Sequence, residues 1–189
     1  LEFRRVLFRS PANEMGPLIS AEHRDRVAGY IAGAVAEGAK VVVDGRNGVP
    51  ADGYFVNPTV IDNVAPGMAC YDDEIFGPVL SVVRVPGYEE GLAMINDNQY
   101  GNGVALFTRD GGAARDFENR VKVGMVGINV PIPVPVSYYS FGGWKNSLFG
   151  DHHMYGPEGI NFFTRTKVVT TRWPDPRTSR VDLGFPQNR

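Results

Sequence analysis

Glu74 and Phe76 are the two residues of this chain best suited, by type and position, to bind a ligand together. They belong to the segment 74–79 (EIFGPV), just before an apolar run, and α/β folds place ligand-contacting loops at the ends of such strands. A carboxylate there can accept hydrogen bonds from two neighbouring sugar hydroxyls, and its charge strengthens them. The face of a phenyl ring can press against an aromatic ring of a ligand. An acidic, solvated loop with a buried Phe explains the same residues, so the pattern alone leaves both interpretations open.

Cys70 is the only cysteine and therefore the only candidate thiol nucleophile. It lies four residues before Glu74, and we expect a packing role for it rather than a catalytic one. A single cysteine also excludes an internal disulfide and suits a reducing compartment, so we expect a cytoplasmic protein, or a mitochondrial-matrix protein if the source is eukaryotic. His23, His152 and His153 have no Cys or carboxylate cluster at metal-ligand spacing, so we predict no metal site.

The composition is that of a globular protein and argues against a nucleic-acid-binding protein and against a transmembrane helix. Of 189 residues, 43% are hydrophobic and 21% charged, which is ordinary for a globular domain. A net charge of −2 gives no positive excess with which to bind a nucleic acid. No apolar run reaches the roughly 18 residues of a transmembrane helix.

The elements around these residues alternate between helix and strand. Ser20 can cap a helix over 21–37, whose apolar stripe is Val27, Tyr30, Ile31, Ala34 and Val35, and Gly38 can end it. We predict a buried strand at 40–43, an extended segment at 54–64 that Pro58 partly demotes to an edge, and a buried strand at 79–85. Further along we predict helices at 88–96 and 110–120 and strands at 104–108 and 124–129. Such alternation predicts an α/β fold, a parallel sheet covered by helices.

Four segments resemble the aldehyde dehydrogenase superfamily, in the family's order. They are Glu74–Val79 (EIFGPV), Asn98–Gly101 (NQYG), Gly124–Asn129 (GMVGIN) and Ser140–Ser147 (SFGGWKNS). The stretch 128–136 (INVPIPVPV), with Trp144, Lys145 and 154–159 (MYGPEG), is similar to the methylmalonate-semialdehyde dehydrogenases of that family. Ser140 departs from the superfamily's usual Pro, a change associated with this subgroup.

The resemblance implies a function. Its members transfer hydride from a thiohemiacetal to NAD, and in this subgroup coenzyme A accepts the acyl group while carbon dioxide is lost. By position, Glu74 would hold the nicotinamide-side ribose and Phe76 would support the nicotinamide ring. Phe141 would line the aldehyde side of the substrate pocket. The family's nucleophilic Cys would lie N-terminal to residue 11, so we expect no catalytic residue in this chain.

The chain is expected to have four parts, which we predict from the composition of its ends together with the resemblance. We interpret residues 1–10 as a non-native scar, 11–165 as the C-terminal part of a catalytic domain, 166–174 as an oligomerisation strand and 175–189 as a flexible tail. The parent enzyme is then a homodimer or homotetramer, and this chain is inactive without the N-terminal half. The alternative is a standalone βαβ module that binds a ligand or assembles with partners without catalysis.

Overall fold

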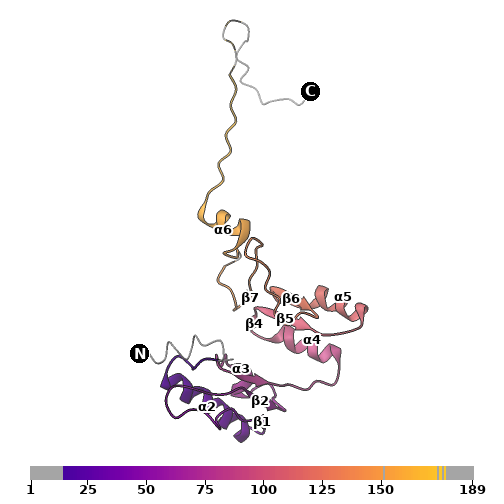
Figure 1. Ribbon diagram of the computed structural model, residues 1–189. Helices are drawn as coiled ribbons and strands as arrows, with labels where there is room; N and C mark the ends of the chain where they lie inside the picture. Colours follow the sequence, from indigo (N-terminus) through magenta and orange to yellow (C-terminus); the bar gives the residue numbers. More distant parts are fainter. Residues whose placement is uncertain (1–14, 151, 174, 176, 178–189) are drawn as a thin grey trace. The chain divides into compact units, whose positions relative to one another are not determined.

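The computed structural model describes residues 15–150, 152–173, 175 and 177, which fall into two compact units divided after Gly91 (Figure 1). Residues 1–10, which we interpret as a scar, and most of the proposed tail 175–189 therefore lie outside the described residues. The first unit contains α2 (Ala21–Ala36), β1 (Lys40–Val43), β2 (Thr59–Asp62), α3 (Ala69–Asp72) and β3 (Val79–Ser81). The second contains most of α4 (Tyr88–Asp97), then β4 (Tyr100–Gly101), β5 (Gly103–Leu106), α5 (Gly111–Arg120), β6 (Met125–Ile128), β7 (Trp144–Lys145) and α6 (Gly156–Phe163).

Helix α2 forms as the sequence predicts. The hydroxyl of Ser20 accepts a hydrogen bond from the backbone N–H of His23 at 3.1 Å, which satisfies one of the free donors at the helix start. Gly38 takes a φ of 103° just beyond the helix, a conformation that favours glycine. Val27, Ile31 and Ala34 are buried and form the core with side chains of β2 and of the loops around α3. Val35, which we expected in this stripe, is instead 52% exposed.

The first unit has a three-stranded sheet in the order β1–β2–β3. β2 pairs parallel with β3 and antiparallel with β1. The prediction that Pro58 makes this region an edge was wrong, because Pro58 lies just before β2 and removes no hydrogen bond from the central strand. The predicted burial of β1 was also wrong, since β1 is an edge strand and Val42 is 56% exposed. β3 covers only Val79–Ser81 of the predicted 79–85 and is partly exposed.

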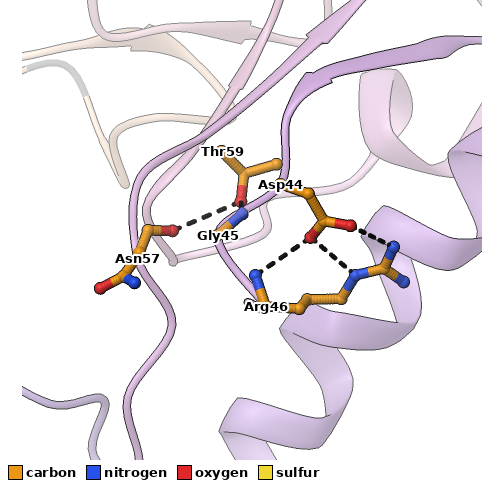
Figure 2. A network of polar contacts seen from close by, with 5 residues as sticks. All are labelled: Asp44, Gly45, Arg46, Asn57 and Thr59. Carbon is orange, nitrogen blue, oxygen red and sulfur yellow. Dashed lines mark hydrogen bonds and ion pairs between the residues drawn. The ribbon is translucent and has the colours of Figure 1, made fainter. Parts of the chain in front are cut away.

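A polar network closes the loop between β1 and β2 (Figure 2). The backbone N–H of Gly45 donates to the hydroxyl of buried Thr59 at 3.0 Å, and that hydroxyl donates to the carbonyl of Asn57 at 3.3 Å. The Arg46 guanidinium donates to both carboxylate oxygens of Asp44, at 2.9 and 2.6 Å. These hydrogen bonds lower the pKa of Asp44 to about 2.

The second unit contains a βαβ crossover. β5 and β6 pair in parallel, and α5 connects them. The carboxylate of Asp110 caps α5, as predicted, by accepting from the N–H groups of Gly112 and Ala113 at 2.7 and 3.1 Å. β4 and β7 form a separate antiparallel pair. The α/β class, with parallel pairing and helices, is confirmed, but two of the strand pairs are antiparallel where we expected a parallel sheet.

The chain continues from α6 as an extended, exposed segment over 164–173 (Figure 1). Val168 is 87% and Trp173 92% exposed, and among the described residues this segment forms no strand pairing. Its proposed role as an oligomerisation strand stays a prediction. None of the helices in the described part of the chain is long and apolar enough to cross a membrane.

Candidate cofactor-binding site

Glu74 lies on the loop between α3 and β3 and is exposed. Within the described part of the chain, its carboxylate makes no hydrogen bond or ion pair. Its neighbour Asp73, by contrast, accepts a hydrogen bond from the hydroxyl of Tyr30 at 2.9 Å. This hydrogen bond raises the pKa of Tyr30. The two adjacent acids therefore differ: Asp73 anchors the loop to α2, while Glu74 has no hydrogen-bond or ion-pair partner among the described residues.

Phe76 has an unusual backbone conformation. Its φ is 55°, in the left-handed region, which costs a residue with a side chain about 1–2 kcal/mol. Its side chain is 75% exposed, so the conformation is not compensated by burial of the ring. The expectation of a flat ring offered to a ligand fits this exposure, and a buried Phe, the alternative, does not. Strained conformations of this kind gather at functional sites.

Contacts with α2 hold the Phe76 backbone in place. The imidazole of His23 makes a hydrogen bond from Nε2 to the carbonyl oxygen of Phe76 at 2.8 Å. The guanidinium of Arg26 lies 2.8 Å from the other ring nitrogen of His23. A hydrogen bond of this kind contributes ~1 kcal/mol net, so the His23 and Tyr30 bonds together roughly offset the strain at Phe76.

Two apolar contacts hold the same loop against the core of the first unit. Ile75, between Glu74 and Phe76, is 9% exposed and belongs to the core of the first unit. Gly77 packs so closely on Val27 of α2 that an added Cβ would lie 2.8 Å from a methyl carbon of that valine. The buried Ile75 therefore separates two exposed side chains, and a close glycine contact ends the loop.

In the second unit the structure brings together two of the sequence motifs. β4, in the segment NQYG, pairs with β7, in SFGGWKNS, so that Gly101 lies opposite Trp144. The backbone N–H of Gly101 also donates to the hydroxyl of Ser147 at 3.1 Å. Lys145, with a φ of 55°, donates from Nζ to the carbonyls of Asn96 and Asn98, each at 2.9 Å. A cation at the end of α4 satisfies carbonyls that the helix leaves free.

Asn129, at the end of β6, has a similar structural role. Its side-chain oxygen accepts from the N–H of Thr108 at 2.9 Å, and its amide donates to the carbonyl of Thr108 at 3.0 Å. The side chain thus extends the β5–β6 pairing beyond the strands. These contacts give Asn129 of GMVGIN, and Lys145 and Ser147 of SFGGWKNS, a structural role.

Phe141 is half-buried, and its ring stacks on that of Tyr155 with centroids 4.3 Å apart and planes 7° apart. Next to it, the hydroxyl of Ser140 lies 3.4 Å from Nδ1 of His153. The structure therefore gives Phe141 an aromatic partner within its own unit. Its role as a wall of the substrate pocket stays a prediction.

Cys70 lies in α3 and is 5% exposed. Burial raises the pKa of its thiol, which leaves less of the nucleophilic thiolate at neutral pH. Cys70 packs against the core of the first unit, in keeping with the expected packing role. Within the described residues, no three His, Cys, Asp or Glu side chains are grouped as they would be around a metal ion.

Sequence reasoning missed the contacts that α2 makes with the loop. From the sequence, His23 is a candidate only for a metal ligand, and Tyr30 only for the apolar stripe. The signal was present in the spacing, since His23, Val27 and Tyr30 are four and three residues apart and share one helix face. What the spacing could not supply is the position of the loop that this face contacts.

A sequence profile of the aldehyde dehydrogenase family matches residues 6–169, and the chain belongs to that family. It is 56% identical over 164 residues to malonate-semialdehyde dehydrogenase of Pseudomonas aeruginosa, a match that covers 85% of this chain and 33% of the relative. It is 49% identical over 166 residues to a Drosophila pseudoobscura protein assigned as a mitochondrial, acylating methylmalonate-semialdehyde/malonate-semialdehyde dehydrogenase, covering 86% and 32% of the two chains.

Among solved structures, the chain is similar to a Sinorhizobium meliloti protein assigned as methylmalonate-semialdehyde dehydrogenase and crystallised in complex with NAD. The TM-score is 0.82 at 52% identity, over 86% of this chain and 34% of the other. The chain thus spans about a third of the length of the relatives that it matches.

Proposed function

We propose that this chain supplies the nicotinamide side of the cofactor site in an NAD-dependent aldehyde dehydrogenase that oxidises malonate or methylmalonate semialdehyde. The observation that carries the proposal is the loop of the first unit, where Phe76 is exposed and in a strained conformation, two residues from Glu74, whose carboxylate has no partner in the described part of the chain. Membership of the aldehyde dehydrogenase family supports the reaction class. The names of the semialdehyde dehydrogenase relatives support the substrate.

The residues of the loop suit a nicotinamide nucleoside. The Glu74 carboxylate would accept hydrogen bonds from the ribose hydroxyls, and the Phe76 ring would limit where the nicotinamide can lie. When bound, NAD supplies the hydride acceptor of the reaction. The contribution of this chain is orientation, because a ring held in one position keeps its reactive carbon near the substrate. Phe141 is proposed to line the aldehyde side.

The remaining features of the proposal come from the relatives. The acylating name of the Drosophila relative supports coenzyme A as the acyl acceptor. We also propose that carbon dioxide is lost, as the resemblance to methylmalonate-semialdehyde dehydrogenases implies. We also propose that residues 166–174 pair with another subunit in a homodimer or homotetramer, which would cover their exposed apolar side chains. The enzyme would act in the cytoplasm, or in the mitochondrial matrix of a eukaryote.

The substitution Glu74→Gln tests this proposal in a chimera in which the chain replaces the matching third of the Pseudomonas aeruginosa relative. Single-turnover hydride transfer is followed as NADH absorbance. Loss of a charge-assisted hydrogen bond should slow it about 10- to 100-fold. Glu118→Gln, an exposed acid on α5, is the matched control and should leave the rate unchanged. An equal rate in Glu74→Gln and the unsubstituted chimera would contradict the role of Glu74.

A further inference from the structure

We infer that His23 is the positioning residue of the cofactor site, and that it acts as the neutral imidazole that carries its proton on Nε2. The inference rests on the proposed function, because it concerns the presentation of Phe76 to the nicotinamide. The proposed role of His23 requires no contact with the ligand. It acts through the backbone carbonyl of Phe76, to which its Nε2 makes a 2.8 Å hydrogen bond.

The contacts of the ring assign its tautomer. A carbonyl oxygen can only accept, so Nε2 must carry the hydrogen that it donates to Phe76. A guanidinium can only donate, so the ring nitrogen 2.8 Å from Arg26, Nδ1, must be unprotonated. The two contacts agree on one neutral form. Arg26 therefore selects the tautomer that can hold Phe76, and a doubly protonated ring would face Arg26 with a second donor.

The charges around His23 come from both elements that meet there. On α2 these are Glu22, Arg24, which is paired with Asp25 at 2.8 Å, and Arg26. On the loop they are Asp73, bound to Tyr30, and Glu74. Among the described residues, Arg26 is the charged group in contact with the imidazole, so it is the charge that, together with the Phe76 carbonyl, sets the tautomer.

The spacing along α2 explains why one helix can position the whole loop. His23, Val27 and Tyr30 lie on one face, and each contacts a different part of the loop: the Phe76 carbonyl, Gly77 and Asp73. The hydrogen bonds of His23 and Tyr30 lie on either side of Glu74 and Ile75. Tyr30 fixes where the loop begins, and His23 fixes the peptide that sets the direction of the Phe76 ring.

Nuclear magnetic resonance on the chain itself tests the structural part. The ¹⁵N shifts of His23 should show a protonated Nε2 and an unprotonated Nδ1, and scalar couplings should show a positive φ at Phe76. The substitution His23→Ala should abolish the positive φ, and His23→Gln, whose amide can donate in the place of Nε2, should retain it. Glu22→Gln, next to His23 but exposed, is the matched control. An Nδ1-protonated ring, or a positive φ retained in His23→Ala, would overturn the inference.

Kinetics of the chimera test the functional part. If only a fraction of the molecules holds Phe76 in the binding-competent conformation, the apparent affinity for NAD is reduced in proportion to that fraction. At saturating NAD the enzyme still reacts at the full rate. His23→Ala should therefore raise the KM for NAD about tenfold and leave kcat within about twofold, and His23→Gln should restore KM. A kcat that falls with KM unchanged would overturn the positioning role. Loss of the positive φ without any change in KM or kcat would instead contradict the proposed function of Phe76.

Discussion

Phe76 combines a side chain that the sequence predicts to contact a ligand, an unusual backbone conformation and a central role in the proposed function. Its type and place before a strand predicted a ring offered to a ligand, and the exposed side chain fits that expectation. Its left-handed φ was not predictable, because nothing in the sequence EIFGPV excludes an ordinary extended Phe. The loop is held by contacts of His23 with Phe76 and of Val27 with Gly77, and both α2 residues are about fifty positions away in the chain.

The substitution Phe76→Gly separates the effect of this residue on the stability of the chain from its effect on the reaction. Phe76→Gly removes the steric cost of the left-handed conformation and little buried surface, so the free energy of unfolding should rise by about 1 kcal/mol. The NAD-dependent reaction of the chimera should be impaired by the same change. Chemical denaturation of the chain measures the first effect. Phe107→Gly, at an exposed Phe without a positive φ, should not stabilise the chain, and a Phe76→Gly variant less stable than the original would refute the argument.

Asp44 makes the stability of the first unit sensitive to acid. Its pKa is lowered from 3.8 to about 2 by Arg46, so the folded chain binds this proton more weakly than the unfolded chain does. The contribution is complete above a pH of about 4 and is lost as the pH falls towards 2. Denaturation curves across this range should show a steeper loss of stability in the original chain than in Arg46→Gln. Parallel curves for the two proteins would mean that the ion pair does not act on stability.

At the scale of elements, the sequence predicted the helices better than the sheet. The N-caps Ser20 and Asp110 are local signals, since each accepts hydrogen bonds from N–H groups only two or three residues away. Whether a strand is central or at an edge depends on which strand lies beside it, which explains the errors at β1 and β2. The pairing of β4 with β7 joins residues more than forty positions apart and likewise left no local signal.

Replacement by Ala should have opposite effects on the free energy of unfolding at two glycines, Gly45 and Gly29. A Cβ on Gly45 would lie 1.8 Å from the carbonyl oxygen of Asn57, so Gly45→Ala should displace the loop of Figure 2 and lower the free energy of unfolding by ~2–3 kcal/mol. A Cβ on Gly29, inside α2, meets nothing within 4 Å. Gly29→Ala should therefore raise the free energy of unfolding by about 0.5–1 kcal/mol. Equilibrium denaturation measures both, and a similar effect of the two substitutions would show that the close contact at Gly45 is not rigid.

At the scale of the whole molecule, the chain corresponds to about a third of the length of its relatives. Its second unit ends in an exposed, β-rich segment whose apolar side chains have no described partner, including Val168, Val169 and Trp173. Composition predicted the strand-forming character of this segment, but a partner strand cannot be inferred from one sequence. Pairing with another subunit remains the proposal.

Removal of this segment tests the proposed assembly. Deleting residues 167–189 from the chimera should convert a dimer or tetramer into smaller species, because the paired edge would be lost. Light scattering coupled to size exclusion gives the mass directly. Replacing Lys167 by Ala leaves the backbone of the segment intact and should preserve the oligomer. An undiminished mass after the deletion would show that the segment does not hold the subunits together.

The proposed function depends most on the contact between the loop 73–77 and the nicotinamide end of the cofactor. The most direct measurement is a crystal structure of the active chimera with NAD bound. We expect the Glu74 carboxylate within hydrogen-bond distance of the ribose hydroxyls and the Phe76 ring against the nicotinamide, with Phe76 still at a positive φ. A bound NAD from which both side chains point away would contradict it.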